Sequence, residues 1–130
     1  MRTPTGLKYA KTDEWIKVEG DEAKLGISDY AQDQLSDVVY VEFMVDVDDH
    51  VSKGDAVATV ESVKAASDVI FPASGTIVAI NEDLADAPEM LNSEPYEGGW
   101  MVKMVLDDPS DLDEMLEAEE YEAYNEEREG

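Results

Sequence analysis

Residues 56–71 read AVATVESVKAASDVIF, and this stretch decides the fold of the chain. Two runs of β-branched and small apolar residues, 56–61 and 67–71, are separated by five residues that contain one lysine, Lys64. Runs of this composition are typical of β-strands, and a short break between them predicts a hairpin. We therefore expect two adjacent strands with Lys64 at or near an exposed tip.

Strand patterns continue on both sides of this hairpin. Residues 15–18 and 22–27 flank Glu19-Gly20-Asp21, and a glycine-centred break between two alternating runs predicts a second hairpin. Ser28 is suited to cap a short helix, because its hydroxyl can accept the free N–H groups of a first turn. Further strands are predicted at 38–45, 76–80 and 100–106, with a short helical turn within 81–92. About seven short strands predict a mainly β fold, a small barrel or sandwich.

The composition changes after Leu106. Residues 107–130 carry 12 carboxylates and one arginine. Ser110 and Asp113 resemble a capping box, and the apolar residues that follow lie on one helical face, namely Leu112, Met115 and Leu116. This pattern predicts a docked helix, whose last residues we do not expect to be ordered because glutamates oppose the dipole there. We thus expect one domain, 1–130, with a β core at about 1–106 and an acidic C-terminal helix and tail at 107–130.

The overall charge excludes several classes of partner. The chain has 33 Asp and Glu against 9 Lys and Arg, a net charge of −24, so nucleic acids and anionic membrane surfaces should be repelled. It has no Cys and one His, which argues against disulfides, thiol catalysis and a zinc site. Because no apolar run approaches the roughly 20 residues that span a bilayer and no leader pattern is seen, we expect a cytoplasmic protein.

Few residue patterns indicate chemistry. Residues 46–50 superficially resemble a calcium loop, but Val51 and Val57 stand where an EF-hand has Gly and Glu, so we reject that site. No two carboxylates are singled out as a glycosidase pair. Lys64 is the remaining candidate. An exposed turn lysine without a function is common, and the alternative is a lysine that a modifying enzyme acylates.

The residues of several segments favour a lysine that is modified. They occur in order along nearly the whole chain: Gly6-Leu7-Lys8-Tyr9, Glu14-Trp15, residues 26–32, Lys53-Gly54-Asp55, residues 61–68, Leu91-Asn92 and Gly98-Gly99-Trp100. In this series the chain resembles the H proteins of the glycine cleavage system, which are lipoyl carriers. The segment 61–68 matches the modification signature of that family.

The resemblance implies a fold, a cofactor and a set of partners. The fold would be a barrel-sandwich hybrid of the lipoyl/biotinyl-carrier type, and Lys64 would carry lipoate in amide linkage. The chain would be a non-catalytic, monomeric carrier that moves an aminomethyl group between enzymes. Its partners would be a pyridoxal-phosphate glycine decarboxylase (P protein), a tetrahydrofolate-dependent aminomethyltransferase (T protein), dihydrolipoamide dehydrogenase (L protein) and lipoylating enzymes.

Three residues are candidates for a pocket that receives the loaded arm. Glu14 and Asp68 lie in segments that resemble the family and could attract a protonated amine, and Ile27 could line the same cleft. Each has an ordinary alternative, a surface carboxylate or a core residue. The family usually has His before its Glu-Trp pair, whereas Asp13 stands there in this chain, so a role of that His cannot be transferred.

Other carriers and an unmodified relative are the alternatives. Biotinyl domains place their lysine between two Met residues, and lipoyl domains of 2-oxoacid dehydrogenases commonly have Asp before it, whereas Val63 and Ala65 flank Lys64. An H-like paralogue could instead act as an acidic interaction protein or in lipoate relay, with Lys64 unmodified. The acidity also motivates a hypothesis that the protein works in concentrated salt, which would screen its self-repulsion.

Overall fold

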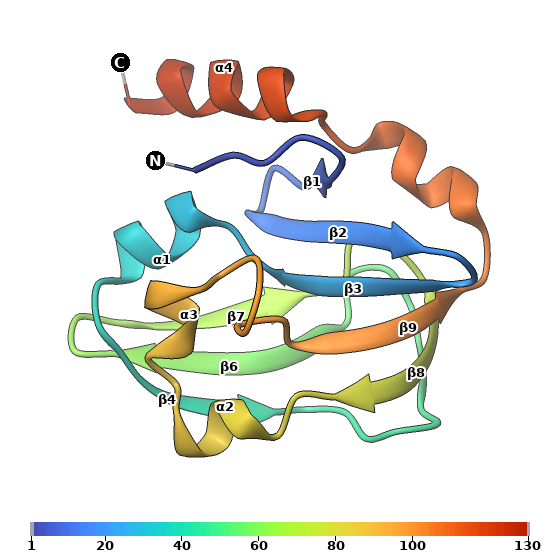
Figure 1. Cartoon of the computed structure of the whole chain (residues 1–130), viewed down its shortest axis with the longest axis horizontal. Coiled ribbons are helices and arrows are strands. Elements are labelled where there is room, and N and C mark those ends of the chain that lie inside the picture. The colour runs from blue at the N-terminus through green and yellow to red at the C-terminus, as the bar shows by residue number, and fades with distance from the viewer. Residues whose placement is uncertain (1, 130) are drawn as a thin grey trace.

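Two antiparallel sheets dominate the computed structural model, which describes residues 2–129 (Figure 1). The larger sheet has six strands, in the spatial order β1 (Lys8–Tyr9), β2 (Glu14–Glu19), β3 (Glu22–Ile27), β9 (Val102–Leu106), β8 (Gly75–Ile80) and β5 (His50–Val51). The smaller sheet has three, in the order β4 (Val38–Phe43), β6 (Ala56–Ser62) and β7 (Ala66–Ile70). The expected mainly β fold is therefore confirmed.

Both predicted hairpins are present. β2 pairs with β3 across the turn at Gly20, whose φ of 66° lies in the left-handed region that glycine adopts without strain. β6 pairs with β7 in a register that places Glu61 opposite Ala66, so the intervening turn contains Lys64. In Figure 1 this turn projects beyond the neighbouring strands, close to the end of the molecule that carries α1 (Asp29–Leu35).

The apolar core fills the space between the sheets. Its fully buried side chains come from both of them and include Leu25, Val57, Val60, Phe71 and Ile77. Buried and more exposed residues alternate along β9 and at the start of β8, as in a half-buried antiparallel sheet, whereas β2 buries its first three residues in a row. Two short helices, α2 (Asp83–Asp86) and α3 (Met90–Ser93), each bury one leucine against this core.

The C-terminal segment differs from the sequence prediction. A 3-10 helix occupies Pro109–Glu114 with Asp108 as its cap, and the α-helix, α4, begins only at Ala118. Leu112 and Met115 are buried as expected, but Leu116 exchanges two backbone hydrogen bonds with Tyr9, at 2.7 and 2.8 Å, and this bridge interrupts the helix. α4 also continues to Glu129, so the expectation that the last residues are not ordered is contradicted for 126–129, while Gly130 lies outside the described residues.

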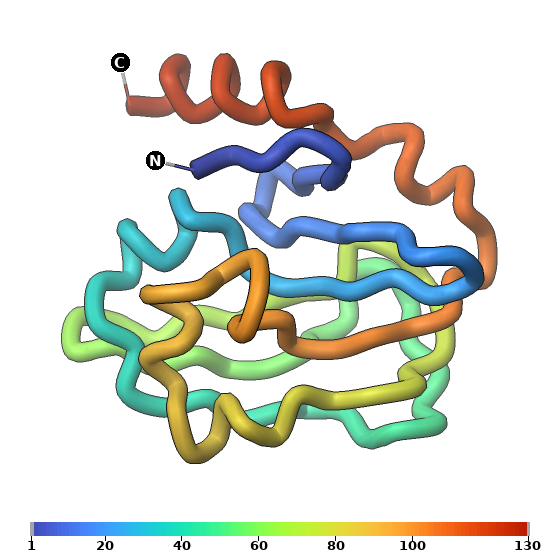
Figure 2. Tube along the Cα trace, viewed as in Figure 1, coloured from blue at the N-terminus to red at the C-terminus, as the bar shows by residue number. Residues whose placement is uncertain are grey.

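The two ends of the chain lie side by side. Figure 2 shows the N-terminal segment running along α4, and the bridge between Tyr9 and Leu116 joins them. The rings of Tyr9 and Tyr121 stack with centroids 4.6 Å apart, and both side chains are buried. Within residues 2–129, no helix has the length and apolar character needed to cross a membrane.

The strand pattern missed two very short strands, β1 and β5. Each has only two residues, too few to show an alternation in the sequence. The single histidine, His50, lies in β5, and its Nε2 is 2.6 Å from a carboxylate oxygen of Asp107.

Candidate functional site

The turn between β6 and β7 is held together by its own atoms. The Ser62 hydroxyl accepts hydrogen bonds from the backbone N–H of Lys64 at 3.2 Å and of Ala65 at 3.0 Å, and the Ser62 N–H donates to the Ala65 carbonyl at 2.8 Å. The Val63 N–H donates to the Asp37 carbonyl at 3.0 Å, which attaches the turn to the start of β4. These bonds fix the backbone and leave the Lys64 side chain exposed.

The Lys64 side chain forms a hydrogen bond with the body of the protein. Its Nζ lies 3.4 Å from the backbone carbonyl of Gln34, near the end of α1. Gln34 is also part of the lining of a cavity of about 160 Å³. The ammonium nitrogen of Lys64 therefore lies beside a residue of the cavity wall, although Lys64 itself does not line the cavity.

The same cavity brings together the three residues that were candidates for an arm pocket. Glu14 comes from the start of β2, Ile27 from the end of β3 and Asp68 from β7. α1 forms another part of the wall with Ala31, Gln34 and Leu35, and the remaining lining residues are Thr12, Asp13, Val60, Ser67 and Val69. Because apolar walls surround a few carboxylates, the cavity suits an aliphatic chain with a cationic end.

Glu14 is the buried acid of this cavity, with only 2% of its surface exposed. One carboxylate oxygen accepts a hydrogen bond from the Thr12 hydroxyl, and the other accepts from the Ile70 N–H at 3.3 Å. Burial raises the pKa of Glu14 to about 7, although both hydrogen bonds act to lower it. A carboxyl with a pKa near neutrality in a cavity is a recognised mark of a functional site.

Asp68 and Ile27 also line the cavity, but they differ in exposure. Asp68 is exposed, and one of its oxygens accepts a hydrogen bond from the Thr59 hydroxyl at 3.0 Å. Ile27 is 3% exposed and belongs to the main core as well as to the cavity wall. Their roles toward a bound arm stay predictions.

Sequence reasoning missed Thr12, Gln34 and the position of Asp13. Thr12 lies two residues before Glu14, and its hydroxyl donates a hydrogen bond to the Glu14 carboxylate. The three consecutive polar residues 12–14, called the corner from here on, could have indicated this arrangement. Gln34 carried no such signal, because its backbone carbonyl rather than its side chain meets Lys64. Asp13 had been considered only as a departure from the family pattern, and it lines the cavity.

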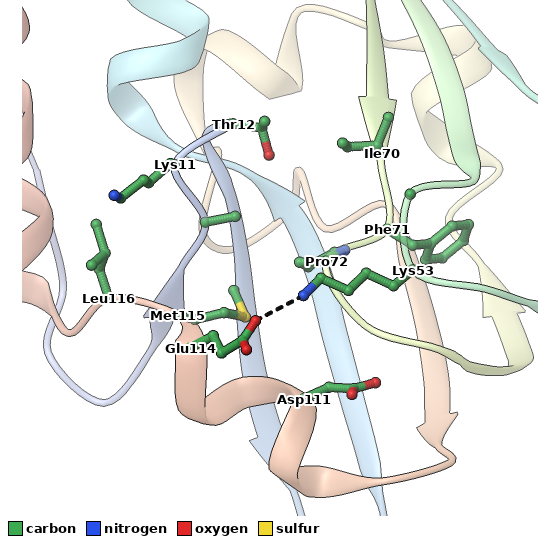
Figure 3. Close-up of a pocket in the computed structure, with 12 residues that line it drawn as sticks. Lys11, Thr12, Lys53, Ile70, Phe71, Pro72, Asp111, Glu114, Met115 and Leu116 are labelled. Carbon is green, nitrogen blue, oxygen red and sulfur yellow. Dashed lines mark hydrogen bonds and ion pairs between the residues drawn. The ribbon is translucent and has the colours of Figure 1, made fainter.

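A second and larger cavity, of about 260 Å³, lies beside the 3-10 helix (Figure 3). Met115, Leu116 and Phe71 form part of its apolar wall, and an ion pair of 3.1 Å between Lys53 and Glu114 crosses it. Its lining contains none of the four residues predicted for the arm site. The predicted arm-pocket residues Glu14, Ile27 and Asp68 all line the smaller cavity instead.

Known proteins show to which family the chain belongs. The family model described as glycine cleavage H-protein matches residues 7–128. The chain belongs to the glycine cleavage H-protein family. It is 55% identical over 108 residues to the glycine cleavage system H protein of Deinococcus deserti, which covers 83% of this chain and 87% of the relative. It is 49% identical over 110 residues to that of Staphylococcus haemolyticus, with 85% and 86% covered.

A solved structure supports the fold. The crystal structure of a glycine cleavage system H protein from Mycobacterium marinum superposes with a TM-score of 0.85 at 34% sequence identity, covering 95% of this chain and 98% of that one. The fold is the barrel-sandwich hybrid of lipoyl carriers, as expected. Membership of this family supports a carrier role in a glycine cleavage system.

Proposed function

We propose that this protein is a non-catalytic lipoyl carrier of the glycine cleavage system and that Lys64 is the residue that bears lipoate. The observation that carries the proposal is the position of Lys64, exposed on a hydrogen-bonded hairpin turn with its Nζ 3.4 Å from the carbonyl of Gln34, a residue of the cavity wall. A modifying enzyme can reach such a lysine from solvent. An arm attached to this nitrogen starts at the entrance of a cavity that can receive it.

The residues of the cavity fit the group that the family implies. Lipoate supplies a disulfide that accepts the aminomethyl group left when glycine loses CO2. Ile27, Leu35 and Val60 provide apolar surface for a hydrocarbon chain, and Glu14 and Asp68 provide carboxylates for a protonated amine. Glu14, whose pKa of about 7 reflects its burial, would ionise more readily when a cation enters.

The composition also supports this function. A dithiol exchanges with any accessible thiolate, and a chain without cysteine cannot capture its own arm in a mixed disulfide. Enclosure in the cavity would shield the cargo from water between enzymes. The chain itself would bind, orient and release this cargo, while the partner enzymes break and form its bonds.

The proposed partners are the glycine decarboxylase, the aminomethyltransferase, dihydrolipoamide dehydrogenase and the lipoylating enzymes. A net charge of −24 would speed association with partner surfaces that are basic. A tethered arm reaches an effective concentration on the order of millimolar within one complex. The carrier can therefore transfer efficiently from weak complexes that separate quickly.

The test is glycine–CO2 exchange in a reconstituted system with the lipoylated protein, Lys64→Arg and Lys53→Arg. Lys64→Arg keeps the charge and removes the acylation site, so we expect it to fold normally and to give only the background of lipoate-free protein. Lys53→Arg, a matched change of an exposed lysine beside the other cavity, should exchange like the unsubstituted protein. Exchange above background with Lys64→Arg would contradict the proposal, and would favour an H-like relative that acts without this modification.

A further inference from the structure

We propose that α4 is a latch on the cavity beside Lys64, in which Arg128 and Tyr121 hold Asp13 and so set how tightly the cavity retains an arm. In this account Asp13, Tyr121 and Arg128 are positioning residues, since they act through the cavity wall. The inference deepens the proposed function and rests on it for the identity of the arm. The link between α4 and the cavity can be tested on the protein without an arm.

Asp13 is the residue through which α4 reaches the cavity. It lines the cavity immediately before Glu14, and its φ of 81° places it in the left-handed region, where an aspartate is strained. Its backbone is held at both ends: its N–H donates to the Ala10 carbonyl and its carbonyl accepts from the Ser28 N–H, each at 2.9 Å. A strained corner of this kind persists only when its surroundings impose it.

Arg128 supplies much of that support from the far end of the chain. One guanidinium nitrogen is 3.3 Å from Asp13 Oδ2, and a second donates to Asp13 Oδ1. The guanidinium carbon lies 3.9 Å from the ring centroid of Tyr30 and 4.6 Å from that of Tyr124. The planar cation is thus held between aromatic rings while it binds the carboxylate, a geometry that lysine cannot reproduce.

Tyr121 connects the latch to a second wall of the cavity. Its hydroxyl donates to Asp13 Oδ1 at 2.6 Å and lies 2.6 Å from the Ser28 hydroxyl oxygen. Ser28 in turn caps α1 by accepting from the Ala31 N–H at 3.1 Å. α1 forms the wall that contains Gln34, the residue that meets Lys64. Burial first, and the bond to Asp13 second, raise the pKa of Tyr121, so its hydroxyl stays a proton donor at physiological pH.

Two walls of one cavity therefore depend on one helix. The corner at residues 12–14 is fixed through Asp13, and the start of α1 is fixed through Ser28. Release of α4 removes both constraints at once. We expect the cavity then to admit water around Glu14 and to hold an arm less tightly.

The first test uses the full-length, unmodified protein and measures the pKa of the Glu14 carboxyl by NMR titration. Admission of water lowers the raised pKa of Glu14, whereas removal of the Arg128 cation without any opening would raise it, so the direction separates the two effects. We expect Arg128→Ala and Tyr121→Phe each to lower it by about half a unit or more. Tyr121→Phe changes no formal charge and keeps the ring that stacks on Tyr9.

Glu117→Gln is the matched control. Glu117 pairs with Lys8 at 2.6 Å and so attaches the start of α4 to β1, but it does not line the cavity. Its substitution should leave the pKa of Glu14 unchanged. A pKa of Glu14 that is unchanged or raised in both latch variants would overturn the proposal, whatever Lys64 carries.

The second test measures the arm itself. Because the chain has no cysteine, a thiol reagent added to the reduced, lipoylated protein reports on the arm alone. With the aminomethyl cargo loaded, Arg128→Ala should expose the arm thiol at least about threefold faster than Glu117→Gln does. Equal rates would overturn the latch and leave the carrier function intact, whereas a protein that accepts no lipoate would contradict the proposed function and leave the titration as the test of the latch.

Discussion

The turn that bears Lys64 contacts a wall of the cavity that Glu14 lines, yet this turn and the corner at residues 12–14 are built in opposite ways. The turn is short and exposed, and its backbone is held by bonds among its own residues and one bond to Asp37. The corner is buried and held by residues from distant parts of the chain, including Tyr121 and Arg128. An attachment site has to be entered by modifying enzymes, while a receiving cavity has to exclude water. Each region therefore has the packing that its proposed role needs.

The largest loss of stability should come from Trp15, the buried residue next to Glu14. Trp15 is fully buried, and its indole N–H donates to the Pro95 carbonyl at 2.9 Å. Trp15→Ala leaves a cavity and an unpaired carbonyl, so we expect a loss of about 3–5 kcal/mol in the free energy of unfolding, measured with urea. A loss below about 1 kcal/mol would show that the corner is not held by this packing.

The next effect concerns the charge inside the cavity. The folded pKa of Glu14, about 7, lies above the ordinary value of 4.5, so the protonated carboxyl stabilises the fold and this contribution is lost as the pH rises from about 4.5 to 7. Glu14→Gln should therefore match the unsubstituted protein at pH 4.5 and be more stable at pH 8, by up to about 3 kcal/mol. Urea unfolding of both proteins across this range gives the comparison. A constant difference between them would contradict a raised pKa.

Salt should raise the melting temperature of the whole protein, because it screens the net negative charge. With 33 acidic against 9 basic side chains, self-repulsion opposes the compact state and is screened by salt. We expect the melting temperature to rise by about 5 °C or more between dilute buffer and molar KCl, which corresponds to about 1 kcal/mol. A melting temperature that is indifferent to KCl would remove the hypothesis that the protein works in concentrated salt.

The smallest effect should come from the turn. Val63 is 70% exposed, and its contribution to the fold is the backbone bond to Asp37, which any residue but proline can make. Val63→Ser should change the free energy of unfolding by less than about 0.5 kcal/mol. Comparison of Val63→Ser with Trp15→Ala in the same urea experiment tests whether the side chains of the turn contribute to the stability of the fold. A loss above about 1 kcal/mol for Val63→Ser would show that the side chain of the turn does contribute to stability.

The same contrast explains what could be predicted from the sequence. The hairpin around Lys64 and the cap at Ser28 are local features, and their residues alone indicated them. The pairing of Asp13 with Arg128 joins positions 115 residues apart, and no local sequence pattern predicts it. The C-terminal helix was placed too early because the bridge from Leu116 to Tyr9 is equally non-local. Glu14, Ile27 and Asp68 were selected as candidates through a family resemblance, and only the fold brings them to one cavity.

The most direct test of the central claim is the intact mass of the protein from its native source or from a host that has lipoylating enzymes and octanoyl or lipoyl donors, followed by mass mapping of the peptide that contains Lys64. We predict one lipoyl group, located on Lys64. A chain that remains unmodified under these conditions, or that carries biotin instead, would contradict the account.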